Sequence, residues 1–209
     1  MFLRVSLGVV LVSQVVLGIS PKADRLTWAL ENAPVWIGLI LLGFTWRRFP
    51  LSRLCLGLFV VHSIILAIGG HWTYANVPMG DWVKERFGLS RNHYDRLGHL
   101  AQGFIPAIFV RELLLRTSSL GRATKWLPFL VVCVCLAFSA VYEFIEWWTA
   151  LIAEAGAVEF LGTQGDLWDT QWDMFLCLVG AMTALVMLSR AHDRSLARLR
   201  PDLVHGPGC

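Results

Sequence analysis

The sequence predicts an all-α membrane protein, a bundle of about six transmembrane helices with both termini on the cytoplasmic side. Two observations lead to this fold class. Hydrophobic residues make up 56% of the 209 residues and charged residues only 16%, whereas a soluble domain carries about 25% charged residues. The apolar residues also gather in blocks of about 20 residues, which is the length that crosses the hydrocarbon core of a bilayer.

Six apolar blocks follow one another along the chain, at residues 3–19, 30–46, 54–70, 97–115, 126–150 and 172–189. Backbone in lipid must satisfy its own hydrogen bonds, so each block is expected to form a helix rather than a strand. Polar segments separate the blocks, and the longest runs from His71 to Arg96. We therefore expect one transmembrane helical domain over residues 1–189 and a basic cytoplasmic tail over residues 190–209.

The first block has two interpretations. Arg4, an apolar run and Gly18-x-Ser20 also fit a signal peptide with its cleavage site. Pro21 directly after Ser20 argues against cleavage, so an uncleaved helix is the prediction. Both interpretations leave the orientation of the five later helices unchanged.

Orientation follows from the basic residues of the short loops, because Lys and Arg are enriched on the cytoplasmic side. With a cytoplasmic N-terminus, twelve Lys and Arg residues fall inside and six fall outside. The segment between the last two blocks holds several acids and no Lys or Arg, which places it outside. The basic run Arg190–Arg200 is expected to lie against anionic lipid.

Charge and cysteine content exclude several function classes. The net charge of +3 is too small to suggest binding to nucleic acid. The five cysteines contain no C-x-x-C pair, so neither a zinc knuckle nor a thioredoxin-like site is expected. The membrane lipid is the partner that the composition predicts.

Polar residues form one stripe on each of the last three helices, near the external end. Their spacing of three or four residues places them on one helix face. The three stripes are Asp95, His99, Gln102 and Pro106; Ser139, Glu143, Glu146 and Ala150; and Asp169, Asp173, Cys177 and Gly180. Charged groups inside a membrane are costly and by default mark a functional site facing the bundle interior.

Histidine and carboxylate oxygens are ligands that suit a divalent metal such as Zn²⁺, Mn²⁺ or Fe²⁺. The predicted metal ligands are His99, Glu143, Glu146, Asp169 and Asp173. Asp95, Asp166 and His93 are predicted secondary residues near the same face. Glu143 or Glu146 would act as the general base on a metal-bound water.

Two other interpretations remain open. Arg91, Arg96 and Lys84 belong to the same face, so the acids could instead form a structural salt-bridge network. An ion or proton pathway would need polar residues through the full membrane depth. The inner halves of the last three helices are almost wholly apolar, and Arg111 and Glu112 are expected to be hydrated at the interface.

Three stretches resemble the signature of the bacterial inner-membrane YjdF family. They are residues 90–99 (SRNHYDRLGH), 142–148 (YEFIEWW) and 162–174 (GTQGDLWDTQWDM). The likeness extends from about Asp24 to Asp193 and implies a multi-pass protein of the bacterial inner membrane. It implies no particular activity.

A weaker resemblance is to the VanZ-like membrane proteins. Their D-x-x-x-H pattern matches Asp95 and His99, whereas Glu146 and Asp173 stand where their patterns have Gln and Asn. The replacements make this site more acidic, which favours a cation. The sequence therefore predicts an uncharacterised inner-membrane protein with an external carboxylate and histidine cluster. A membrane-embedded hydrolase acting on lipid or envelope precursors is its most specific functional hypothesis.

Overall fold

The computed structural model describes residues 2–153 and 163–199, and within these ranges the regular secondary structure is helical. Its long helices largely coincide with the predicted apolar blocks. The helices are α1 (Phe2–Gly18), α2 (Arg25–Thr45), α3 (Arg53–Trp72), η1 (Tyr74–Asn76), α4 (Pro78–Phe87), α5 (Tyr94–Thr117), α6 (Trp126–Ala153) and α8 (Asp169–Ala197).

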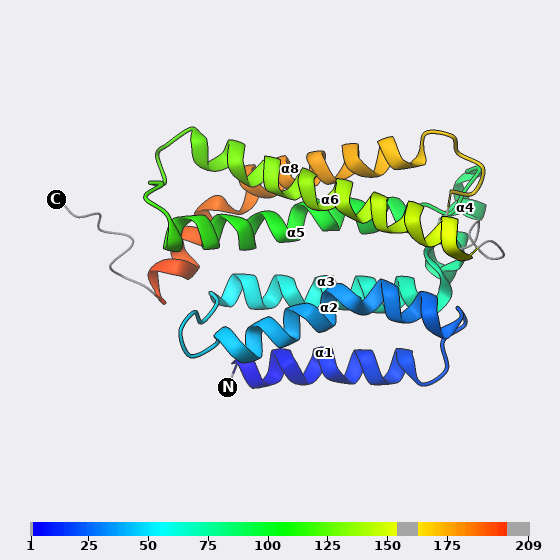
Figure 1. Cartoon of the computed structure of the whole chain (residues 1–209), viewed down its shortest axis with the longest axis horizontal. Helices are drawn as coiled ribbons and strands as arrows, with labels where there is room; N and C mark the ends of the chain where they lie inside the picture. Colours follow the sequence, from blue (N-terminus) through cyan, green and yellow to red (C-terminus); the bar gives the residue numbers. More distant parts are fainter. Residues whose placement is uncertain (1, 154–162, 200–209) are drawn as a thin grey trace.

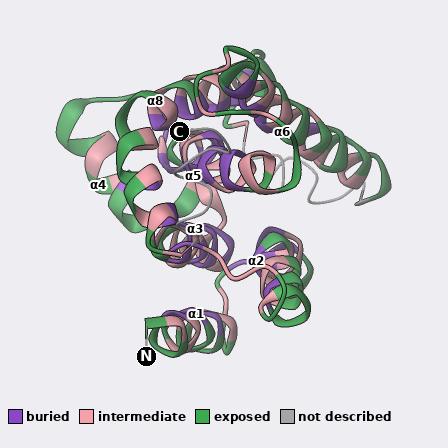
Figure 2. Ribbon diagram, turned by 90° about the vertical axis from the view of Figure 1, so that its left-hand side faces the viewer, coloured by how far each residue is buried: buried purple, intermediate pink, exposed green. Residues whose placement is uncertain are grey.

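The six long helices run side by side along the longest axis of the molecule (Figure 1). Helices α1, α2 and α3 form one group, and α5, α6 and α8 form a second group that packs on α3 (Figures 1 and 2). Helix α4 is short and lies at one end of the bundle, here named the α4 end. The first residues of α1 and the last residues of α8 lie at the opposite end, here named the N-terminal end.

Large apolar side chains cover much of the outside of the bundle. Phe44, Ile152 and Val186 are each more than 80% exposed, and many other Val, Leu, Ile and Phe side chains are also exposed. An exposed apolar surface of this extent is abnormal for a soluble monomer and is the surface that lipid covers. Among the described residues, α2, α3, α6 and α8 are long and apolar enough to cross a membrane.

Two predicted boundaries differ from the structure. The segment His71–Arg96, expected to be a loop, contains η1 and α4. Pro78 begins α4 at a position where its missing N–H costs nothing, and Gly88 ends the helix in the left-handed conformation (φ 62°). At the other end of the chain α8 continues to Ala197, so the predicted tail begins as helix. Residues 200–209 lie outside the described ranges.

Helices α5 and α8 make the most extensive helix–helix contact of the described residues. Two glycines allow their backbones to touch. A Cβ atom on Gly103 would lie 1.9 Å from the carbonyl oxygen of Cys177, and one on Gly180 would lie 2.1 Å from that of Leu100. Small residues at a crossing are the usual way for membrane helices to gain close packing.

A chain of polar contacts joins α1 to α2. The Gln14 side chain donates from Nε2 to Asn32 Oδ1 at 2.9 Å, and the Trp36 indole N–H donates to Gln14 Oε1 at 2.9 Å. Asn32 in turn donates to the carbonyl oxygen of Trp28 at 2.8 Å. Gln14 and Asn32 are buried. These bonds satisfy groups that would be costly to leave unpaired in lipid.

Asp24 caps the first turn of α2. Its Oδ1 accepts from the N–H of Leu26 at 2.9 Å and of Thr27 at 3.0 Å, and its Oδ2 accepts from the Thr27 hydroxyl at 2.5 Å. The Thr27 hydroxyl is the largest of the contacts that lower the pKa of Asp24 below its ordinary value of 3.8. Hydrogen bonds to the ionised form favour that form.

We expect Asp24→Ala to lower the free energy of unfolding by about 1 kcal/mol, the usual loss for a helix cap. Because the folded pKa is depressed, this stabilisation is complete above the unfolded pKa and is lost as the pH falls through the folded pKa. The difference in free energy of unfolding between the wild type and Asp24→Ala should therefore shrink below about pH 4. Denaturant unfolding in detergent at pH 7 and pH 3 measures it, and a difference that grows on acidification would contradict it.

Candidate functional site

A histidine surrounded by carboxylates lies near the α4 end, between α5, α6 and α8. His99 Nε2 is 3.5 Å from Asp95 Oδ1 and 3.8 Å from Asp173 Oδ2, and His99 Nδ1 is 3.8 Å from Glu143 Oε1. All four side chains are buried. These four residues are named the His99 cluster. One ligand atom each from Asp95, His99 and Asp173 lie within 4.8 Å of one another.

In a neutral His99 ring, the Gln102 contact selects the nitrogen that carries the proton. Gln102 Oε1 lies 3.0 Å from His99 Nδ1, and a carbonyl oxygen can only accept a hydrogen bond. Nδ1 of a neutral ring is therefore the donor, and Nε2 presents its lone pair to Asp95 and Asp173. Metal-binding histidines are oriented in this way, with the second nitrogen donating to an oxygen.

Two carboxylate oxygens of the His99 cluster have no hydrogen-bond donor in the described part of the chain. They are Glu143 Oε1 and Asp173 Oδ1, and both atoms are buried. Leaving a buried carboxylate oxygen unpaired is expensive. A bound cation or added protons would remove the cost.

Arg91 separates the other acids from the His99 cluster. Its guanidinium is hydrogen-bonded to Asp169 and lies 3.5 Å from Asp166 Oδ2 and 3.6 Å from Asp95 Oδ2. Arg96 pairs with Asp166 at 2.5 Å. Asp169 and Asp166 are thus neutralised by arginine. Asp95 contacts both the Arg91 network and His99.

The predicted site residues therefore divide into groups. His99 and Asp173 lie together with Asp95, which was predicted only as a secondary residue. Glu143 approaches His99 from the Nδ1 side. Glu146 is half-buried at the edge of the α6 face, next to a buried stripe formed by Leu127, Val131, Cys135, Ser139 and Glu143.

His93 lies just before α5, in a half-buried position outside the spans. Burial, followed by the nearby charges of Arg96 and Arg91, lowers the pKa of His93, so it is neutral at pH 7. Gly162, the first residue of the predicted loop motif, lies outside the described residues. Gln164 of that motif accepts from Asn92 N–H and donates to Asn92 O, each at 2.9 Å, and so holds the loop against the start of α5.

Glu31 is a buried acid that the sequence argument did not single out. It lies on α2, and its Oε2 accepts from the Tyr142 hydroxyl of α6 at 3.0 Å. This bond joins the two helix groups near the α4 end. The sequence could have identified Glu31 as a candidate, because it is a carboxylate inside a predicted span, and such residues are costly in a membrane.

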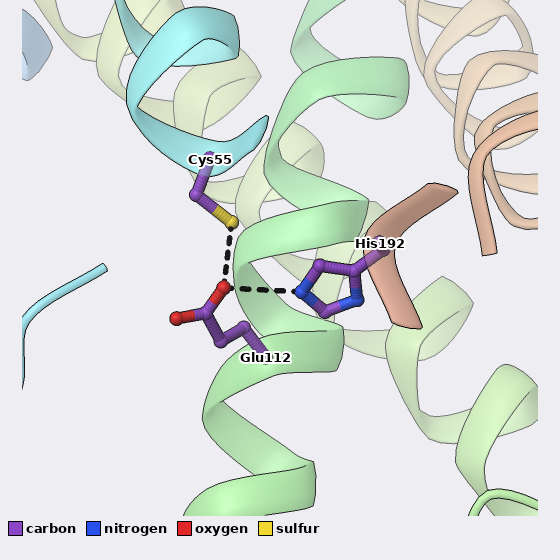
Figure 3. A group of neighbouring side chains, drawn as sticks. All are labelled: Cys55, Glu112 and His192. Atoms are coloured by element: carbon purple, nitrogen blue, oxygen red, sulfur yellow. Dashed lines mark hydrogen bonds and ion pairs between the residues drawn. The ribbon is translucent and has the colours of Figure 1, made fainter. Parts of the chain in front are cut away.

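A second polar cluster lies toward the N-terminal end and combines Cys55, Glu112 and His192 (Figure 3). Glu112 Oε2 accepts from Cys55 Sγ at 3.1 Å and from His192 Nε2 at 3.0 Å. Glu112 Oε1 accepts from the N–H of Ser52 at 3.0 Å and from Arg116 at 2.9 Å. The Glu112 carboxylate therefore has donors at both oxygens.

The Glu112 cluster is poorly suited to a metal, although its residue types are typical ligands. Arg111 donates to His192 Nδ1 at 2.6 Å, so Nδ1 is the acceptor and Nε2 carries the proton that goes to Glu112. Nε2 of His192 therefore has no lone pair for a metal, unlike Nε2 of a neutral His99 ring. The expectation that Arg111 and Glu112 are hydrated is wrong, because both are buried, Glu112 completely.

Comparison with known proteins finds similarity to membrane proteins. A family model described as "Predicted membrane protein (DUF2238)" matches residues 2–194. The inner membrane protein YjdF of Escherichia coli (strain K12) is 54% identical over 175 residues, which cover 84% of this chain and 83% of that protein. No solved structure matches the chain. The predicted YjdF resemblance and inner-membrane location are confirmed, and the chain belongs to the DUF2238 family of predicted membrane proteins.

Proposed function

We propose that this protein binds one divalent cation between Asp95, His99 and Asp173 at the α4 end of the bundle. The observation that carries the proposal is the position of His99 Nε2, which lies 3.5 Å from Asp95 Oδ1 and 3.8 Å from Asp173 Oδ2. When the ring is neutral and Nδ1 donates to Gln102, Nε2 presents its lone pair to both carboxylates. Two ligands each about 2.1 Å from a tetrahedral zinc ion are about 3.4 Å apart. The three groups are thus separated by nearly the distances that a shared metal requires.

The chemistry that such a site supports best is hydrolysis. Asp95, His99 and Asp173 would hold the cation, which would supply an activated water, and a neighbouring carboxylate would accept a proton from that water during attack on a phosphoryl or acyl group. Glu143 is the candidate base, because its unpaired oxygen lies beside His99. Glu146, half-buried on the same helix, is the second candidate. A lipid or lipid-linked envelope precursor is the substrate class that a membrane site admits.

We also propose that all six long helices cross the membrane, with both termini in the cytoplasm. Three features support this topology. Consecutive long helices run in opposite directions along the bundle (Figure 1). The basic residues are twice as numerous on the proposed cytoplasmic side, and the run Arg190–Arg200 would lie against anionic lipid there. The His99 cluster would then face the outer leaflet.

Metal analysis of the purified protein tests the cation site. We expect about one Zn²⁺ or Mn²⁺ per chain, and we expect Asp173→Asn and His99→Gln to weaken metal binding by at least about tenfold, because each removes a direct ligand. Elemental analysis gives the stoichiometry, and titration with Zn²⁺ and Mn²⁺ gives the dissociation constants.

Asp166→Asn is the matched control, because it also removes one acid at the same end but pairs with Arg96 rather than His99. It should leave metal affinity unchanged. Wild-type protein that binds no divalent metal, or equal losses in Asp166→Asn and Asp173→Asn, would contradict the proposal.

A structural role for the same acids is the second candidate, and Arg91 is the observation that favours it. Arg91 already contacts Asp95, Asp166 and Asp169, and a protonated His99 would complete an ion-pair network without metal. In that case Asp173→Asn lowers thermal stability to the same extent with and without added metal. The cation proposal instead expects metal to stabilise the wild type and not the variant.

A further inference from the structure

An apolar groove runs along the outside of the bundle between α1 and α3. It has a volume of about 880 Å³ and is closed toward the α4 end by residues 77–79. Its walls include Val9, Val12, Ile64 and Ile68, and side chains of Val9 and Val12 are more than 40% exposed. The groove lies on the α1 side of α3, whereas the His99 cluster lies between α5, α6 and α8.

A polar pocket of about 330 Å³ lies beyond the end of this groove, and Trp72 lines both. Lys22 is the cation of this pocket, and no carboxylate of the described residues lies within 4 Å of its ammonium group. The one acid of the pocket, Asp24, is occupied as the cap of α2. Thr73, also in the wall, holds a left-handed conformation (φ 56°), which is strained for a β-branched residue.

The dimensions of the groove fit a lipid chain. Its α1 wall extends from Val5 to Leu17, twelve residues apart, which is about 18 Å of helix. One leaflet of hydrocarbon is about 15 Å thick. The polar pocket lies at the end of α1 where the chain leaves the apolar block, at the level where headgroups lie.

We propose that the groove and the pocket together bind one glycerophospholipid of the leaflet at the α4 end. An acyl chain lies between α1 and α3, the glycerol region lies against Trp72, and the phosphate pairs with the Lys22 ammonium group. Tryptophan is the side chain best suited to the boundary between chain and headgroup. This lipid site does not depend on the proposed cation.

Gly8 offers a way to close the groove without disturbing the protein. It lines the groove, and a Cβ atom placed on it meets no heavy atom within 4 Å. Gly8→Phe therefore projects a ring into the groove. Gly43 is the matched control, because it is also a helical glycine with open space around its Cβ position, but it lies on α2 away from the groove.

The test measures lipid binding by native mass spectrometry of delipidated protein, in EDTA, with phosphatidylglycerol and with diacylglycerol of the same chains. We expect the wild type to retain one phosphatidylglycerol. Gly8→Phe should lower the affinity for both lipids by more than about tenfold, because the acyl chain is no longer buried. Gly43→Phe should lower neither affinity. Lys22→Gln should lower the affinity for phosphatidylglycerol alone, by about fivefold.

Three outcomes would overturn the proposal. Equal losses in Gly8→Phe and Gly43→Phe would mean that the lipid binds the general surface. If the wild type binds the two lipids equally and Lys22→Gln does not change either affinity, the proposed contact between Lys22 and the phosphate is wrong. A change of oligomeric state in Gly8→Phe without a change in bound lipid would make the groove an interface between copies.

Discussion

Replacing Glu112 with alanine is expected to lower the free energy of unfolding by about 3–5 kcal/mol, the range for breaking a buried, hydrogen-bonded ion pair. The Glu112 carboxylate is completely buried and accepts from Ser52, Cys55, Arg116 and His192. Without it, the backbone N–H of Ser52 loses its acceptor, and the buried Arg116 guanidinium loses its carboxylate partner while it keeps the carbonyl oxygen of Pro50. Each unpaired group then carries its own desolvation cost.

The effect should also be structural, because this cluster joins separate parts of the chain. Ser52 caps α3, Glu112 belongs to α5 and His192 to α8. A second bond, from the N–H of Leu54 to Ser195 Oγ at 3.1 Å, ties the same helix start to α8. Loss of Glu112 is therefore expected to loosen the N-terminal end of the bundle as a unit.

Denaturant or thermal unfolding in detergent measures the loss. Glu85→Ala is the control, since Glu85 is an exposed acid on α4 and its removal should change stability by less than about 0.5 kcal/mol. Glu112→Gln should be milder than Glu112→Ala, because the amide oxygen still accepts from Ser52. A Glu112→Ala variant as stable as Glu85→Ala would show that the cluster contributes nothing to folding.

Gly103→Ala is expected to destabilise the protein by about 3 kcal/mol, the upper part of the usual range for overpacking. The added Cβ would lie 1.9 Å from the carbonyl oxygen of Cys177 and 2.8 Å from its Cα. These are backbone atoms, which cannot rotate away as a flexible side chain does. Helices α5 and α8 must therefore move apart, although theirs is the most extensive helix–helix contact within residues 2–153 and 163–199.

Gly43→Ala is the matched control for this substitution. The Cβ there meets nothing within 4 Å, and alanine is the better helix former, so stability should rise by about 0.5–1 kcal/mol. The double variant Gly103→Ala with Gly180→Ala should lose less stability than the sum of the two single losses, because both substitutions open the same helix crossing. A stable Gly103→Ala variant would mean that α5 and α8 do not meet at this glycine.

The two buried polar clusters have similar composition but opposite chemical states. A neutral His99 ring donates from Nδ1 to Gln102 and presents an Nε2 lone pair to the acids, whereas His192 accepts at Nδ1 from Arg111 and donates from Nε2. The first has unpaired carboxylate oxygens, and the second has a carboxylate with donors at both oxygens. This contrast makes the His99 cluster the better candidate for a bound cation.

Much of the local structure could be predicted from the sequence. The apolar blocks predicted the long helices because a single apolar segment of about 20 residues satisfies its backbone hydrogen bonds within itself only as a helix. The three-to-four-residue spacing also predicted buried faces. Asp95 and His99 are buried on α5, Ser139 and Glu143 on α6, and Asp173 and Cys177 on α8. Helix α4 was missed because its alternation of apolar and charged residues does not form a block.

The partners of the polar residues could not be predicted in the same way. Periodicity places a side chain on a helix face, but the contact that neutralises it depends on how helices far apart in sequence pack. Asp169 shares a stripe with Asp173, yet the first pairs with Arg91 and the second faces His99.

Composition and periodicity by themselves determined that this chain is a multi-pass helical membrane protein with acids and histidines near one end of the bundle. Only the tertiary structure decided which acids are neutralised by arginine, and that Glu112 and His192, 80 residues apart, are joined by a hydrogen bond. The physical reason is that hydrophobicity acts on each helix separately. Ion pairs and histidine tautomers depend on distances of a few ångströms between helices, which exist only after packing.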